Sequence, residues 1–478
     1  MTADHSDAGR PSDDRDRSAE NDRAAKDGPP DGLTDGPRVR PGERGAVVWA
    51  TAWFFFILLG YLIVRPVRET MGSIGGTKQL QGLMLVTFAV MLVAVPIYSA
   101  LVARLPRRWL VRVVYHFFAA CLLAFFLLMR VDNESVQVAT ARVFFVWVNV
   151  FSLFATSVFW SVLADLFSSS QGKRLFGMVA AGGTAGAITG SLLTSQLASV
   201  LSTSWLLLIP VVMIEIGLMC AWRLETTVAK NGVGSERGLS GGAAADDAKA
   251  GDADSDKPTG GGLLSGITHV ASSPYLMMIC LFLFFVQACG TQLYFEQAEI
   301  VADQIETKQQ RTELFAYLDL GTQVLTLLVQ WLLSGVILRR LGVAVSLVIL
   351  PCVYAAGFAS LAVAPVLLTL CVVVVISRAI GYGITVPARE VLFTVVSREE
   401  KYKSKSFIDT VVLRGGDAIS GQIFGSLRSW GLSLSVLNLW AIPLTGLWAV
   451  VAWRLGRKQQ QRSVRIPNTH RPGKKPTP

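Results

Sequence analysis

The sequence predicts an all-α integral membrane protein with twelve transmembrane helices. Its 478 residues are 52% hydrophobic and 16% charged, whereas soluble proteins average about 45–50% and about 25%. The apolar residues gather in runs of about twenty, the length that a helix needs to cross a bilayer. Such runs are too long and too continuously apolar to be the alternating strands of a membrane barrel.

Twelve predicted spans follow one another along the chain, separated by polar segments. They cover 46–64, 80–103, 109–129, 140–164, 176–200, 204–223, 275–298, 314–337, 342–362, 366–388, 407–429 and 434–455. The first span ends near Pro66 and three glycines, and basic loops follow spans two, four, eight and ten. The longest break, GGAAADDAKAGDADSDKPTGGG, lies between spans six and seven and has too few apolar residues to build a core.

These features divide the chain into five parts. We expect a disordered tail at 1–45, a six-helix half at 46–224, a disordered linker at 225–273, a second six-helix half at 274–455 and a basic tail at 456–478. No secretory signal precedes the first span, so we expect that span to be an uncleaved anchor. Because each half has an even number of spans, both enter the membrane from the same side, which predicts a parallel repeat.

The basic residues of the loops predict the orientation in the membrane. Eleven lie on the side of both termini: Arg104, Arg107, Arg108, Lys173, Arg174, Arg339, Arg340, Arg398, Lys401, Lys403 and Lys405. Six lie on the other side: Arg65, Arg68, Lys78, Arg130, Lys308 and Arg311. The positive-inside rule therefore places both termini in the cytoplasm. The net charge of +10 suits an anionic inner leaflet and requires no nucleic-acid partner. We expect a monomer in the lipid bilayer.

Charged residues within the apolar runs predict a transporter of a small hydrophilic molecule. A charge near the bilayer centre costs about 2.5–3.5 kcal/mol, so it persists where it pairs or lines a watery cavity. Arg65 and Arg68 are three residues apart and share a helical face, with Glu69 beside them. Paired guanidiniums suit a phosphate or a carboxylate. The alternative is that both arginines anchor a helix end at the interface.

Spans seven and eight contribute carboxylates. Gln292, Glu296, Glu299 and Asp303 recur at helical spacing and form one stripe. We assign Glu296 to charge balance or proton coupling, whereas Glu299 and Asp303 suit a solvated helix end. Asp319, on one polar face of span eight, is predicted to line the cavity and balance its cations.

The end of span ten is the stripe that best suits a substrate. Arg378, Tyr382 and Arg389 share one face, which brings an aromatic ring together with two cations. The alternative is a cytoplasmic gate in which Arg389 and Glu390 pair with the following loop, as far as Asp409. One residue can serve both roles.

Spans four and eleven complete the predicted cavity. Asn149 and Trp160 lie on one face of span four, with Trp160 assigned to substrate binding and Asp165 near the span's end to charge balance or gating. Arg414 and Asp417 lie one turn apart in span eleven, so we expect them to pair within the membrane.

Four polar stretches resemble the ATP/ADP translocase family of nucleotide transporters, in particular its free-living bacterial branch. They are IVRPVRET (63–70), FWSVLADLFSSSQGKRLFG (159–177), LYFEQAEIV (293–301) and VPAREVLFTVVSREEKYKSKSFIDTVVLRGGDAISG (386–421). Twelve spans in two parallel sixes also resemble the major facilitator superfamily. These resemblances imply a major-facilitator-like fold in a bacterial inner membrane, alternating access, and an antiport of ATP against ADP.

The chain departs from the nucleotide exchangers at two charged positions. Asp417 stands where the resemblance implies a lysine, and Val148 or Asn149 stands where it implies a glutamate. Three functions therefore remain open: exchange of nucleotides, H⁺-coupled transport of another phosphorylated or carboxylated metabolite, and a non-transporting sensor or scaffold with the same fold.

The remaining motifs do not predict an enzyme. Gly182, Gly186 and Gly190 recur every four residues within a span, which indicates close helix packing rather than a phosphate loop. No Walker sequence is present, because Gly172-Lys173 is followed by arginine rather than by serine or threonine. The four histidines form no metal-like or triad-like pattern. We expect no catalytic residue, no cofactor and no metal.

Overall fold

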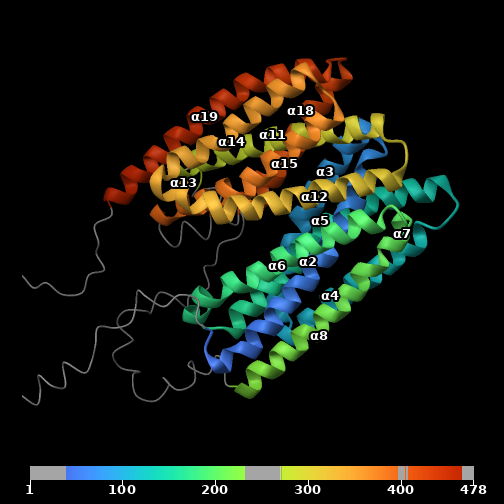
Figure 1. The fold of residues 1–478 in the computed structure, drawn as a ribbon, viewed down its shortest axis with the longest axis vertical. Coiled ribbons are helices and arrows are strands. Elements are labelled where there is room, and N and C mark those ends of the chain that lie inside the picture. Colours follow the sequence, from blue (N-terminus) through green and yellow to red (C-terminus); the bar gives the residue numbers. More distant parts are fainter. Residues whose placement is uncertain (1–38, 232–269, 271, 397–403, 405–406, 466–478) are drawn as a thin grey trace, which may run out of the picture.

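The computed structural model describes residues 39–231, 270, 272–396, 404 and 407–465, and every regular element in these ranges is a helix. Figure 1 shows two groups of long helices. The first group contains η1 (Pro41–Glu43), α2 (Arg44–Ser73), α3 (Gly76–Arg104), α4 (Arg107–Leu128), α5 (Glu134–Leu166), α6 (Ser169–Leu197), α7 (Thr203–Leu206) and α8 (Leu208–Asn231).

The second group contains three π-helical segments besides its α-helices. Its elements are α11 (Pro274–Gln304), α12 (Lys308–Val329), η3 (Gln330–Ser334), α13 (Gly335–Arg340), α14 (Gly342–Val363), α15 (Leu367–Ile380), η4 (Gly381–Thr385), α16 (Val386–Leu392), η5 (Phe393–Val395), η6 (Ile408–Val412), α18 (Leu413–Ser429) and α19 (Leu434–Arg465). The π-helices are η3, η4 and η6. Such segments are frequent at functional sites.

The predicted all-α membrane fold is confirmed. Within the described residues, 11 helices are long and apolar enough to cross a membrane. The predicted span 407–429, which η6 and α18 form, lies outside that set, and it is the less apolar because it carries Arg414, Asp417 and Arg428. This segment nevertheless packs lengthwise on α11 and α3, so the twelve predicted spans correspond to helical segments of the structure.

Local sequence signals set where several helices begin. The side chain of Asn133 accepts a hydrogen bond from the backbone of Val136 at 3.2 Å and caps α5. Ser168 and Gln171 form a capping box at the start of α6. Gly342, the first residue of α14, has a φ of +79°, a conformation that favours glycine.

Four predicted boundaries are wrong, because helices continue past them. Helix α2 runs through Pro66 to Ser73, and neighbouring helices allow a buried proline within a span. Helix α8 continues to Asn231, so residues 225–231 are helical rather than part of a linker, and Glu225 there pairs with Arg108 at 3.4 Å. Residues 41–45 and 456–465 are also helical. The rest of the predicted tails and linker, at 1–38, 232–269, 271 and 466–478, lies outside the described residues.

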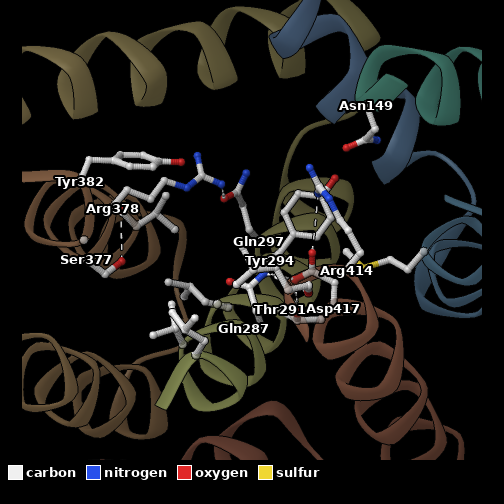
Figure 2. Close-up of a pocket in the computed structure, with 18 of the residues that line it drawn as sticks. Asn149, Gln287, Thr291, Tyr294, Gln297, Ser377, Arg378, Tyr382, Arg414 and Asp417 are labelled. Atoms are coloured by element: carbon white, nitrogen blue, oxygen red, sulfur yellow. Dashed lines mark hydrogen bonds and ion pairs between the residues drawn. The ribbon is translucent and has the colours of Figure 1, made fainter. Parts of the chain in front are cut away.

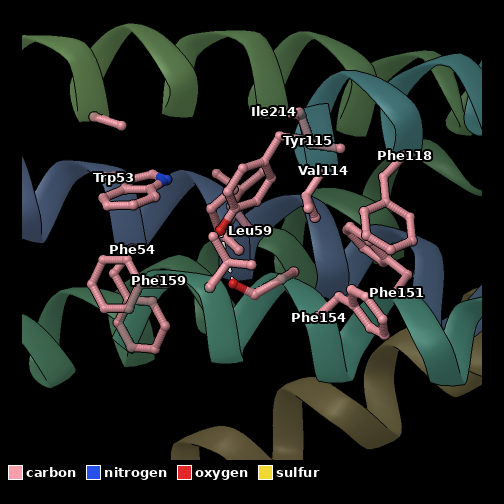
Figure 3. Close-up of a cluster of buried hydrophobic side chains, with 14 of the residues drawn as sticks. Trp53, Phe54, Leu59, Val114, Tyr115, Phe118, Phe151, Phe154, Phe159 and Ile214 are labelled. Atoms are coloured by element: carbon pink, nitrogen blue, oxygen red, sulfur yellow. Dashed lines mark hydrogen bonds between the residues drawn. The ribbon is translucent and has the colours of Figure 1, made fainter. Parts of the chain in front are cut away.

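Aromatic side chains fill the core of the first group (Figure 3). Phe159 stacks on Phe54 with ring centroids 4.3 Å apart and meets the edge of Trp53 at 4.9 Å. The hydroxyl of Tyr115 donates to the carbonyl of Ala155 at 2.7 Å, which satisfies a buried polar group. This packing holds α2, α4 and α5 together as a rigid wall.

The glycines of α6 face α2 directly, as their spacing predicted. A Cβ atom added at Gly186 or Gly190 would overlap the backbone carbonyls of Phe55 and Leu59. The prediction of close helix packing is therefore confirmed. This contact holds α2, the helix that carries Arg65 and Arg68, against α6.

The two groups meet at one end of the molecule, which we call the closed end. It comprises the turns near 73–76, 304–308 and 429–434. Here Leu80, Leu83, Phe145, Phe295, Phe424 and Leu437 form a small hydrophobic cluster that joins both groups. Figure 1 shows the groups spreading apart toward the opposite end, where α8 and α19 end. We call this opposite end the terminal end.

Candidate functional site

A cavity of about 410 Å³ lies between the two groups of helices. Helices α2, α3 and α5 line it on one side, and α11, α14, α15 and α18 with η4 and α16 line it on the other. Figure 2 shows side chains from both groups pointing into this space. Its polar lining consists of Arg65, Arg68, Glu69, Thr87, Asn149, Gln287, Thr291, Tyr294, Gln297, Tyr354, Ser377, Arg378, Tyr382, Thr385, Arg389, Arg414 and Asp417.

Arg65 and Arg68 lie inside the protein rather than at a helix end, so the alternative of interfacial anchors is wrong. Their side chains are 12% and 13% exposed. Arg68 pairs with the adjacent Glu69, donates from Nη1 to Oδ1 of Asn149 at 3.2 Å, and lies 5.7 Å from the ring centre of Phe145. Arg68 is thereby held by its own helix and by α5.

Asp319 connects the two groups of helices. Its Oδ1 lies 3.5 Å from Nη1 of Arg65 in α2 and 3.6 Å from Nη1 of Arg378 in α15. The Asp319 side chain is 2% exposed, and its Oδ2 atom has no hydrogen-bond partner among the described residues. One buried carboxylate thus balances two arginines on opposite walls of the cavity.

A stripe of α11 that we did not predict faces the cavity. Gln287, Thr291, Tyr294 and Gln297 all line it, and Oε1 of Gln297 accepts from Nη2 of Arg378 at 3.1 Å. Their spacing of three to four residues was visible in the sequence. The predicted acidic stripe lies on a neighbouring face of the same helix. The acidic residues of α11 therefore predicted its cavity-facing side less well than its uncharged polar residues would have done.

Arg414 and Asp417 pair as predicted, with Nη1 of Arg414 3.8 Å from Oδ2 of Asp417. The Oδ1 atom of Asp417 also accepts from Nε2 of Gln287 at 2.6 Å and from Oγ1 of Thr291 at 3.1 Å. Figure 2 shows these side chains gathered on one side of the cavity. The carboxylate therefore accepts two hydrogen bonds and pairs with one cation.

The remaining residues of span ten lie in and after a π-helix. Tyr382 belongs to η4 and is 46% exposed, and Arg389 lies about two turns later in α16. Nη2 of Arg389 is 3.2 Å from Oε1 of Glu390. Both the substrate role and the gate role of Arg389 stay predictions, since the loop at 397–403 and 405–406 lies outside the described residues.

Five predicted site residues are not part of the cavity lining: Trp160, Asp165, Glu296, Asp319 and Glu390. Glu296 is buried at the closed end and accepts from Nδ2 of Asn438 at 2.7 Å. Trp160 packs among aromatic rings, 5.4 Å from the ring centre of Phe54. Asp165 is exposed near the end of α5. Asp409 belongs to η6, and its side chain lies outside the described residues, so its role stays a prediction. Helical spacing identified polar faces correctly but not the neighbour that covers each face.

Glu299 corrects a further prediction. We expected a solvated helix end, but Glu299 pairs with Arg428 of α18 and accepts from Oγ1 of Thr77 in α3 at 3.3 Å. It therefore belongs to the contacts that join both groups at the closed end.

Comparison with known proteins places the fold in a large superfamily. A sequence model of the Major Facilitator Superfamily matches residues 45–415. No curated protein matches the sequence. One solved structure that shares the fold is a bacterial homologue of the human lysosomal transporter Spinster, in an inward-facing and unoccupied conformation. Its TM-score is 0.54 at 15% identity, and the match covers 88% of this chain and 99% of that one. Another is a POT family transporter in complex with a thioalcohol-conjugated peptide, with a TM-score of 0.56 at 10% identity and coverage of 87% of this chain and 96% of that one.

A point mutant of the nucleoside transporter NupG also shares the fold, with a TM-score of 0.52, 12% identity and coverage of 87% of this chain and 98% of that one. At such low identities these structures support the fold alone. The sequence match covers more than half of the chain, and the helices are arranged as in these transporters. The chain therefore belongs to the major facilitator superfamily.

Proposed function

We propose that the protein is a secondary transporter that carries an organic anion across the membrane by alternating access. One observation supports this most directly: five arginines line the cavity, and they outnumber the four carboxylates that pair with them. The arginines are Arg65, Arg68, Arg378, Arg389 and Arg414, and the carboxylates are Glu69, Asp319, Glu390 and Asp417. Buried charges of this kind are costly, so their accumulation at one cavity calls for an anionic ligand.

The lining offers donors for such an anion. Nε of Arg68 and Nε of Arg389 are buried and have no hydrogen-bond partner among the described residues. The planar guanidinium fork suits carboxylate and phosphate oxygens. Tyr382 adds a half-exposed aromatic face. The volume of about 410 Å³ falls in the usual range for small-molecule sites, about 300–1,000 Å³.

The closed end supports alternating access. Gln81 of α3 and Gln422 of α18 exchange two hydrogen bonds, each from a side-chain amide to the other's carbonyl, at 3.1 and 3.0 Å. Arg311 donates to the hydroxyl of Ser73 at 3.3 Å. These contacts would break as the two groups rock about the cavity and open it at this end. With cytoplasmic termini, the described state is the inward-facing one.

Nucleotide exchange is the first candidate cargo, and it rests on the four stretches that resemble ATP/ADP translocases. The arginines would bind the phosphates, and Tyr382 would stack on the base. We place this antiporter in a bacterial inner membrane as a monomer.

Transport of another anion with H⁺ is the second candidate, and the position of Asp319 favours it. Because Asp319 balances Arg65 and Arg378 together, a proton on its carboxyl would release both arginines for a substrate. Asp417, which stands where the nucleotide exchangers have a lysine, also favours a different anion.

The test is uptake of labelled ATP by liposomes that contain the purified protein and are preloaded with unlabelled ADP. Saturable uptake that requires the preload would support nucleotide exchange. The double variant Arg68→Gln/Glu69→Gln removes the central cation together with its carboxylate partner. Arg65, which lies 3.9 Å from Glu69, keeps its pairing with Asp319. We expect at least about a 100-fold loss of transport, since a buried charge contact with a substrate contributes about 2–5 kcal/mol.

The matched control is Arg112→Gln, which removes an exposed arginine of α4 away from the cavity. Its uptake should equal that of the wild type. If ATP is not transported, the same liposomes are tested with phosphorylated and carboxylated metabolites across a pH gradient. Folded protein that transports none of these anions would overturn the proposal and favour a sensor or scaffold.

A further inference from the structure

We propose that an anionic phospholipid binds at the terminal end of α14 and α19, with its headgroup phosphate on Arg457. The structure forms a separate cavity of about 340 Å³ there. Its walls include Leu341, Trp453, Arg457, Gln460 and Gln461. This cavity lies outside the substrate site and shares no lining residue with it.

The walls of the lipid cavity are held in place by close helix packing. A Cβ atom added at Gly456 of α19 would overlap the backbone of Ala344 in α14. Gly342 turns the chain into α14 with a φ of +79°, and a Cβ there would lie 2.9 Å from Nε2 of Gln460. The close contact between the backbones of α14 and α19 therefore holds the walls of this cavity at a fixed separation.

The cavity combines polar donors with exposed apolar surface. Trp453 is 41% exposed and Leu341 is 55% exposed. The guanidinium carbon of Arg457 lies 5.0 Å from the ring centre of Trp453, and the amides of Gln460 and Gln461 flank it. Tryptophan and arginine are typical of the boundary between acyl chains and headgroups. An acyl chain would lie along Trp453 and Leu341, which distinguishes a lipid from a free phosphate.

The charge around the cavity favours an anionic lipid over a neutral one. Further basic residues of α13 and α19 are exposed at the same end: Arg339, Arg340, Arg454, Lys458 and Arg462. The sequence of α13, α14 and α19 contains no aspartate or glutamate. Basic pockets between transmembrane helices bind acidic headgroups in this way.

The test is native mass spectrometry of the full-length protein in detergent, titrated with phosphatidylglycerol or with phosphatidylcholine of the same acyl chains. We expect phosphatidylglycerol to bind at least about 5-fold more tightly. Arg457→Gln should weaken its binding by about 5-fold, because a basic residue near an anionic headgroup contributes about 1 kcal/mol. Arg457→Lys should retain most of the affinity.

Arg223→Gln is the matched control, since Arg223 also lies over an exposed tryptophan, Trp222, at 5.3 Å, but on the first group and close to Glu225. It should leave binding unchanged. Equal affinities for the two lipids, or equal effects of Arg457→Gln and Arg223→Gln, would overturn the proposal. Displacement by glycerol phosphate at concentrations similar to those of the lipid would also overturn it, because the site would then be one for free small anions.

Discussion

The central cavity and the closed end both place charged side chains inside apolar helices, but they engage them differently. At the closed end, Glu299 pairs with Arg428 and accepts from Thr77 of the other group. In the cavity, Asp319 is shared by Arg65 and Arg378. Nε of Arg68 and Nε of Arg389 have no hydrogen-bond partner within the described ranges.

This difference separates two roles of buried charge. Polar groups that are fully paired across an interface hold its two sides together. Groups that share a partner keep donor or acceptor atoms that can still bind a ligand. We therefore assign the closed end to joining the helix groups and the cavity to binding. The predictions below test that assignment in order of decreasing effect.

The largest expected effect comes from fixing the closed end covalently. Gln81→Cys and Gln422→Cys, joined by a short reducible thiol cross-linker, should reduce uptake to background, because the groups could no longer separate there. The background chain has the exposed Cys352 replaced by serine. The measurement is liposome uptake before and after reduction, which should restore transport. Each single-cysteine variant, treated alike, serves as the control, and full uptake by cross-linked protein would refute the assignment.

A smaller effect is expected from Asp319→Asn, which removes the carboxylate that competes with the substrate. Release of Arg65 and Arg378 should tighten substrate binding by about 10-fold. A buried charge contact between an arginine and the substrate contributes about 2–5 kcal/mol of binding free energy, but the variant also leaves two buried arginines without their carboxylate, and this cost offsets part of the gain. Turnover should slow, because the anion leaves less readily. Equilibrium binding of the transported anion checks this, with Asp319→Glu as the charge-preserving control. Weaker binding by a folded Asp319→Asn protein would be the opposite of our expectation.

The smallest effect on transport is expected at Glu43, outside the membrane spans. Burial by itself raises the pKa of Glu43, but hydrogen bonds from Arg174, the Arg40 backbone and Gln171 lower it overall below its ordinary value of 4.5. Because the folded pKa is the lower one, these bonds stabilise the fold above pH 4.5, and the benefit is lost as the pH falls through the folded value.

Glu43→Gln should therefore destabilise the protein by about 1–3 kcal/mol at pH 7 and by less below pH 4.5, with uptake unchanged. Thermal unfolding in detergent at both pH values measures the difference. A destabilisation that stays constant with pH would show that the charge of Glu43 is not involved.

Much of the fold was predictable because the bilayer imposes long apolar helices. The spans, the glycine face of α6 and the pairing of Arg414 with Asp417 all depend on residues near one another in sequence or on a simple period. The end of α2 was mispredicted because Pro66 is a local signal for a helix end, whereas the surrounding helices hold the segment helical to Ser73.

The candidate site was only partly predictable, because periodicity identifies a face but not what covers it. Glu296 and Gln297 are adjacent, yet Gln297 faces the cavity while Glu296 faces Asn438 of α19. Glu299 pairs with Arg428, which is far from it in the sequence. Both outcomes depend on how α11 is rotated against α18 and α19, which is a property of the packed helices.

The most direct test of the account is the accessibility of a single cysteine in the cavity lining, Val386→Cys, in a chain without its other cysteines, since Val386 lines the cavity and is 39% exposed. A membrane-impermeant thiol reagent is applied to oriented vesicles from either side. We predict fast labelling from the side of the terminal end, slow labelling from the side of the closed end, and protection by the transported anion. Equal labelling from both sides, with no protection by any anion that the liposomes take up, would contradict a substrate cavity sealed at one end.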